Sequence, residues 1–200
     1  MLDASLLSLA SILFLVVDPI GCIPTISALI KDFDFRRQRQ ILFRETGIAL
    51  IIALFFQYLG EAFLGLMGIA DFALQITGGI LLLIVAFQMI FAIGLPMAKE
   101  ENQPPKREPF IFPIATPLLS GPGLLAIIML QSRIQTSWKL TLALLIAWIG
   151  VFAVLAIAPF LQKLLKKSGL IALEQVMGMT LAMLSVEMLV KGTSNFIKTL

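Results

Sequence analysis

The sequence predicts an all-α polytopic membrane protein with six transmembrane helices, arranged as two inverted three-helix repeats. Three observations predict this class. The 200-residue chain is 59% hydrophobic and only 14% charged, whereas soluble domains are about 45–50% apolar and about 25% charged. Six apolar runs each approach the ~20 residues that cross a bilayer. The first and fourth runs are interrupted by Pro and Gly at matching places in the two halves.

The predicted spans follow from the apolar runs in order. They cover residues 6–30, 41–60, 72–97, 109–132, 140–161 and 169–190. Arg44, Glu45 and Glu174 make the ends of the second and sixth spans less apolar. The chain starts "MLDASLLSL", with an acid where a signal peptide is basic, so we expect the first span to be retained.

The basic residues predict the orientation of the spans. Eleven of the 15 Lys and Arg residues fall in the connections after the first, third and fifth spans. The positive-inside rule places these connections in the cytoplasm and both termini outside it. The basic excess is therefore a topology signal, and we expect no nucleic-acid partner. An alternative role for "FRRQRQ" is binding to anionic membrane lipid.

One polar stretch divides the chain nearly in half. "AKEENQPPKREP" carries alternating charges and three prolines between the third and fourth spans. It predicts a first repeat over residues 1–98, a cytoplasmic linker over 99–108 and a second repeat over 109–200. Because each half has an odd number of spans, the second must be inverted relative to the first. Inverted repeats with broken helices are typical of secondary transporters.

The two interruptions predict a binding site at mid-membrane. Asp18-Pro19 is a typical helix start, with an N-cap followed by Pro at the first position, and Ser120-Gly121-Pro122 repeats this signal. The two helix N-termini would then face each other and attract a carboxylate. The carbonyl ends of the preceding half-helices would attract an ammonium group, so a small zwitterion suits the site. Thr116 adds a hydroxyl just before the second break.

Two acids in the apolar spans have alternative interpretations. Asp18 either caps a half-helix only or shares in binding and proton coupling, because acids at membrane depth are rarely kept without a function. Glu187 either forms an i,i+4 pair with Lys191 or is a second candidate for proton coupling. Broken backbone at this depth requires protein or a cavity around it, so we expect a polar cavity.

The composition also excludes several kinds of chemistry. The chain has no His and one Cys, so it can form neither a histidine metal site, nor a histidine triad, nor an internal disulfide. We therefore expect no metal, no cofactor and no enzymatic activity. Helix N-termini also bind phosphate, which makes an enzyme acting on lipid phosphates a rival. No basic residue lies near the breaks to complete such a site.

The segments "DPIGCIP", "QITGGILLLIVAFQMIF" and "FPIATPLLSGPGLLAIIML" resemble the MarC family. This family includes the SnatA-type transporters of small neutral amino acids, and the resemblance covers essentially the whole chain. It implies an inner-membrane location, transport of glycine, alanine and related amino acids, and coupling to protons. Many relatives have Asn at the position of Asp18. Matched by position, the implied site residues are Asp18, Pro19, Ile20, Gly21, Pro24, Ser120, Gly121, Pro122 and Gly123.

Together these observations predict a secondary transporter that moves small neutral amino acids across the inner membrane by alternating access. Proton coupling through Asp18 or Glu187 is a separate hypothesis. Alternatives are an exporter of other small metabolites or drugs and a membrane scaffold without a solute path. The sequence leaves the oligomeric state open.

Overall fold

Every element among the described residues is helical, which confirms the all-α part of the prediction. The structure, a computed structural model, describes residues 4–91, 109–111 and 114–199, without the side chains of 159 and 162–167. The elements are α1 (Ala4–Val17), α2 (Ile23–Ile30), α3 (Phe35–Met67), α4 (Asp71–Ile90), the π-helical segment η2 (Ile114–Leu119), α5 (Pro122–Ile134) and α6 (Ser137–Ile197).

Four helical stretches of the described chain have the length and apolarity to cross a membrane. They are Phe35–Met67, Asp71–Ile90, Ser137–Ala158 and Ser168–Ile197. The first and fourth predicted spans are each divided in two, and their longer pieces, α1 and α5, are short apolar helices. The predicted linker 99–108 and the end of the third span lie outside the described residues. The six-span inverted arrangement therefore stays a prediction.

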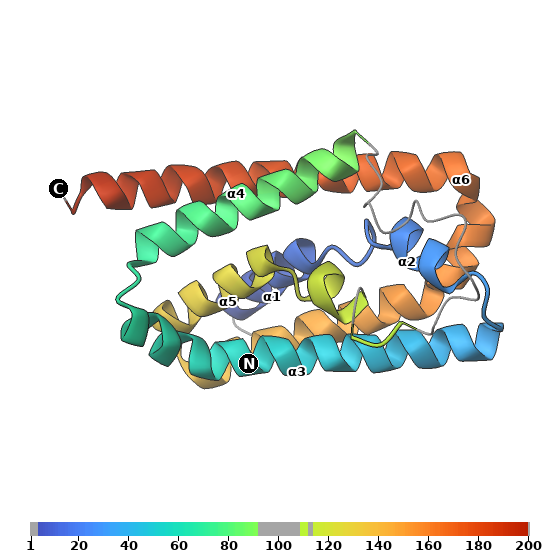
Figure 1. Ribbon diagram of the computed structural model, residues 1–200, viewed down its shortest axis with the longest axis horizontal. Coiled ribbons are helices and arrows are strands. Elements are labelled where there is room, and N and C mark those ends of the chain that lie inside the picture. Colours follow the sequence, from blue (N-terminus) through green and yellow to red (C-terminus); the bar gives the residue numbers. More distant parts are fainter. Residues whose placement is uncertain (1–3, 92–108, 112–113, 200) are drawn as a thin grey trace.

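The connection between the fifth and sixth predicted spans is helical. α6 runs without interruption from Ser137 to Ile197, and Figure 1 shows it turning back at the right-hand end of the molecule. The intervening "LQKLLKKSG" is rich in Leu and Lys, which are good helix formers. We call Ser137–Ala158 the first arm and Ser168–Ile197 the second arm.

α3 and the first arm of α6 form one wall, joined by buried polar groups. The Gln57 side-chain amide donates to the Thr141 hydroxyl at 2.7 Å and to the Ser137 carbonyl at 2.9 Å. The Trp148 indole N–H donates to the Thr46 carbonyl at 2.9 Å. Each bond is worth more in a low-dielectric interior than in water, so these contacts fix the register of the two helices.

α4 and the second arm form the opposite wall, which runs along the top of Figure 1. Asn195 donates to the Gln75 side-chain oxygen and Gln175 donates to the Ile90 carbonyl, both at 3.0 Å. Glycines let the backbones approach: a Cβ on Gly178 would lie 2.8 Å from the Met89 Cβ. Small residues at helix contacts are typical of membrane proteins.

The two broken segments lie between these walls and run in opposite directions. In Figure 1, α1 and α2 run from left to right, whereas η2 and α5 run from right to left. Their contact surfaces are apolar, with Leu13, Ile26, Leu119 and Ile128 fully buried. Opposed directions are what an inverted repeat requires.

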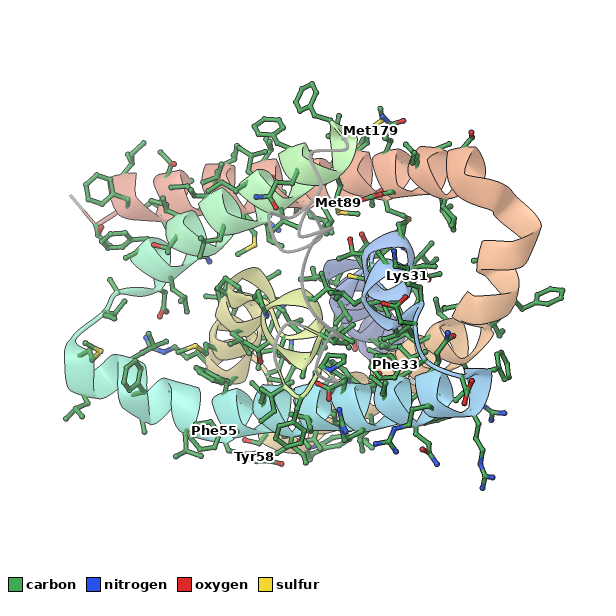
Figure 2. The ribbon with its side chains drawn as sticks, turned by 45° about the vertical axis from the view of Figure 1, so that its right-hand side comes forward. Lys31, Phe33, Phe55, Tyr58, Met89 and Met179 are labelled. Atoms are coloured by element: carbon green, nitrogen blue, oxygen red, sulfur yellow. The ribbon has the colours of Figure 1, made fainter. Side chains whose placement is uncertain are left out.

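The outer faces of the walls are apolar as well. Phe55 and Tyr58 project outward from α3 in Figure 2, and Ile149 and Met183 on α6 are 70% and 73% exposed. Soluble monomers rarely expose apolar surface on this scale. These faces therefore contact lipid, as expected for a membrane protein.

The close contact of Gly178 with α4 gives a stability test. Gly178→Ala should lower the melting temperature of the detergent-purified protein, because overpacking costs about 1–3 kcal/mol. Gly47→Ala is the matched control, since nothing lies within 4 Å of a Cβ there. Alanine is a better helix former than glycine by about 1 kcal/mol, so the control should keep or raise the melting temperature. Equal melting temperatures for the two variants would contradict close packing at Gly178.

Candidate functional site

The two helix breaks meet at Cys22. Its Sγ lies 3.8 Å from the Val17 carbonyl, at the end of α1, and 4.0 Å from the Leu118 carbonyl, in the last turn of η2. These two residues are far apart in the sequence. The contact therefore places the end of the first half-helix of each broken segment at one point.

Asp18 shapes the first break with both its backbone and its carboxylate. Its φ of +46° is left-handed, a conformation that Asp adopts more readily than most residues. Oδ1 accepts the Gly21 N–H at 3.0 Å, which closes a turn. Asp18 is 2% exposed, and its Oδ2 has no hydrogen-bond partner among the described residues.

The start of α2 differs from the sequence prediction. α2 begins at Ile23 with Cys22 at the N-cap position, and Pro24 lies in the first turn. Asp18 therefore caps the turn before the helix rather than the helix itself. The reason is its left-handed backbone, which inserts a turn over residues 19–22 before helical geometry resumes.

Position 21 leaves little space for a side chain. A Cβ there would lie 2.2 Å from Asp18 Oδ2 and 2.2 Å from the Met89 Cε. In Figure 2, Met89 lies on the side of α4 that faces the inner segments. Any side chain at position 21 would therefore displace the Asp18 carboxylate or Met89.

The second break is built from Pro and Gly with support from α3. Pro122 starts α5, as predicted, but Gly121 is the N-cap residue. The Ser120 hydroxyl instead donates to the Ala49 carbonyl at 2.9 Å, which corrects its predicted capping role. A Cβ on Gly121 would lie 2.9 Å from the Pro117 carbonyl oxygen, and one on Gly123 would lie 2.6 Å from Leu82.

A cavity of about 250 Å³ lies where the breaks meet, and we call it the central pocket. α1, α2, α4, η2, α5 and the second arm of α6 all contribute to its walls. Five predicted site residues line it, namely Asp18, Gly21, Gly121, Pro122 and Gly123. Its other polar side chains belong to Thr25, Gln88, Glu174 and Cys22.

Comparison with known proteins identifies the family. The profile of the MarC family integral membrane proteins matches residues 4–197. The chain belongs to the MarC family. It is 36% identical over 195 residues to the UPF0056 inner membrane protein YhgN of Escherichia coli K12, covering 96% of this chain and 98% of that protein. A UPF0056 membrane protein of Chlamydia pneumoniae is 32% identical over 191 residues, covering 94% of each chain. No solved structure matches.

The remaining predicted site residues of this MarC-family chain lie around the central pocket rather than on its surface. Pro19, Ile20 and Pro24 form the turn and the start of α2. The Thr116 hydroxyl is buried without a hydrogen-bond partner among the described residues. Glu187 lies elsewhere: its carboxylate is 2.5 Å from the Lys191 ammonium on the exposed face of the second arm.

Sequence reasoning missed three polar residues of the pocket: Thr25, Gln88 and Glu174. Gln88 and Glu174 were visible as polar residues in or at the ends of apolar runs. No sequence signal places Glu174 beside Asp18, because the two acids share the pocket only through the position of the second arm of α6 beside the first break.

Cys22 provides a direct test of the pocket. A small membrane-impermeant thiosulfonate reagent should modify the folded wild-type protein, because Cys22 lines the central pocket and is the only cysteine. Mass spectrometry measures the modification, and Cys22→Ser is the unmodified control. A scaffold without a solute path needs no such access. Modification only after denaturation in detergent would contradict an accessible pocket.

Proposed function

We propose that this protein is a secondary transporter of small neutral amino acids, such as glycine and alanine, across the inner membrane. The observation that carries the proposal is the central pocket at the meeting point of two broken helices. Discontinuous helices at membrane depth are tolerated where they are buried in protein or line a cavity. Substrate sites of secondary transporters lie at such breaks.

The N-terminus of α5 supplies the anion-binding part of the pocket. The first N–H groups of a helix have no intrahelical acceptor, and the helix dipole adds a partial positive charge. The Leu125 N–H reaches the Gly121 carbonyl at 3.1 Å, and Pro122 has no N–H. The N–H groups of Gly123 and Leu124 are therefore those that a substrate carboxylate would meet.

The opposite side of the pocket supplies acceptors. Val16, Val17 and Asp18 form the C-terminal end of α1 and the start of the turn, and all three line the cavity. Helix C-termini carry a partial negative charge, and Asp18 Oδ2 is unpaired among the described residues. An ammonium group suits this side, so a zwitterion would lie between the two ends.

The size of the pocket favours a small solute. Its volume of about 250 Å³ lies below the ~300–1,000 Å³ of pockets for drug-sized ligands. Leu81, Leu82, Val85 and Leu181 line it and leave few polar partners for a substrate side chain. These features support glycine- and alanine-like substrates over drugs.

Proton coupling is assigned to Asp18 within this proposal. Asp18 lies in the pocket beside the expected ammonium position, so its charge can respond to substrate binding. Glu187 lies outside the pocket with Lys191. Of the two candidate acids for proton coupling, we therefore propose Asp18 and not Glu187.

Transport itself is tested with proteoliposomes that contain the purified protein. Saturable uptake of labelled glycine and alanine is expected. Gly21→Leu and Gly123→Leu should each abolish it, because their side chains would collide with Asp18, Met89 or Leu82. Gly65→Leu is the control, since nothing lies within 4 Å of a Cβ there. Normal uptake by both pocket variants would overturn the proposal.

Coupling is tested by imposing a pH gradient on the same proteoliposomes. Asp18→Asn keeps an oxygen acceptor for the Gly21 N–H but cannot take up and release a proton. It should abolish gradient-driven accumulation of glycine, whereas exchange of internal for external glycine should persist with a higher half-saturating glycine concentration, because Asp18 also contacts the ammonium group in this proposal. Accumulation that survives in the Asp18→Asn, Glu187→Gln double variant would rule out coupling through either acid.

A further inference from the structure

Glu174 lies in the same pocket as Asp18, although the two residues come from opposite ends of the chain. Glu174 is partly buried on the second arm of α6 and Asp18 is buried at the first break. Both side chains line the central pocket, and they lie within range of each other's charge. The central pocket therefore contains two carboxylates.

No basic side chain balances these two acids among the residues that line the pocket. The ion pairs within the described part of the chain do not include either acid. They join Arg44 to Glu45, Arg133 to Asp71 and Lys191 to Glu187. Like charges repel strongly where the dielectric is low, and a buried charge without a partner is costly.

The Asp18 carboxylate is also divided between two tasks. Oδ1 is occupied by the Gly21 N–H at 3.0 Å, whereas Oδ2 is buried with no described partner. Buried polar atoms in native structures almost always have a partner. An unpaired carboxylate oxygen, a second carboxylate and the carbonyl end of α1 together form a set of acceptors that lacks a donor.

This set of acceptors is smaller than a divalent metal requires. Among the described residues, no group of three or more His, Cys, Asp or Glu side chains could hold a metal ion. Calcium takes about six to eight oxygen ligands and magnesium about six. Two carboxylates with one amide, Gln88, instead match a compact cation that needs three or four acceptors, such as an ammonium group.

We propose that Asp18 and Glu174 together bind one monovalent cationic group in the central pocket. This inference rests on the proposed function for its main source of the group, the ammonium end of a transported amino acid. A free alkali cation is the other source of the same chemistry. The proposed function uses Asp18 alone, and this inference adds Glu174 as a second binding residue.

The carboxylate pair also sets the orientation and selectivity of the substrate. The ammonium group would lie between Asp18 and Glu174, and the carboxylate would point toward the N-terminus of α5. An acidic amino acid would bring a further negative charge beside the pair, and like-charge contacts disfavour the wrong partner. Aspartate and glutamate should therefore bind more weakly than glycine and alanine.

The experiment measures thermal unfolding of the full-length purified protein with small probes. Methylammonium tests the cationic group alone, acetate tests the carboxylate alone, and glycine carries both. Sodium chloride is compared with choline chloride at equal ionic strength. Because a ligand that binds only the folded state raises its stability, the melting temperature should rise with methylammonium and glycine.

Glu174→Gln isolates the second acid. The methylammonium concentration for a half-maximal shift should rise at least about tenfold, since a charged hydrogen bond contributes about 1.5 kcal/mol or more. Glu61→Gln is the matched control, because Glu61 is exposed on α3 and does not line the pocket. If sodium chloride raises the melting temperature as much as methylammonium does, and if Glu174→Gln weakens both effects equally, the site binds a free cation.

Two results would overturn the inference. One is a rise in the melting temperature of the wild-type protein with acetate but not with methylammonium. This result does not depend on the folding of any variant. The other is an unchanged methylammonium concentration in Glu174→Gln. Glycine uptake measured in parallel separates the two proposals: absent uptake with Glu174-dependent methylammonium binding would remove the transport function and leave the cation site standing.

Discussion

The structure depends on one constraint: backbone polar groups at a helix break need partners, and lipid offers none. Both breaks are therefore enclosed by protein. The Asp18 carboxylate serves the Gly21 N–H, and the Ser120 hydroxyl and the Ala49 carbonyl join the second break to α3. Two walls of long apolar helices shield both breaks from lipid, and the pocket forms where they meet.

The same residues that end the helices also define the chemistry of the pocket. A Cβ added at Gly21, Gly121 or Gly123 would lie less than 3 Å from a neighbouring atom. Their lack of side chains leaves the space that a small solute would occupy. Asp18 belongs to both the turn and the pocket, because one carboxylate oxygen accepts the Gly21 N–H and the other has no hydrogen-bond partner among the described residues. In the proposed function, one side chain therefore serves both folding and binding.

Much of this arrangement follows from the sequence, because Pro and Gly in an apolar run have few structural outcomes. They predicted both breaks and four of the glycine and aspartate residues that line the pocket. The exact helix starts were not predictable, because Asp18 adopts a left-handed backbone and Ser120 finds an acceptor on another helix. Local sequence permits both choices but does not dictate either.

The role of Glu174 was unpredictable for a different reason. Its position in the sequence, near the end of an apolar run, is typical of an acid at the membrane surface. Only the fold of α6, which brings the second arm beside α1 and α4, places it in the pocket. The sequence made no prediction for the connection between the two arms, because good helix formers also occur in surface connections.

The composition of the two walls has a mechanical consequence. Each wall joins a helix from one half of the sequence to an arm of α6 from the other half, so the two halves of the sequence are interleaved. The two walls are also tied by covalent links at opposite ends, through residues 68–70 and through the bend of α6. Such a closed frame resists separation of the halves as rigid bodies. In the proposed transporter, the inner segments α1, α2, η2 and α5 are the elements that lie outside this frame.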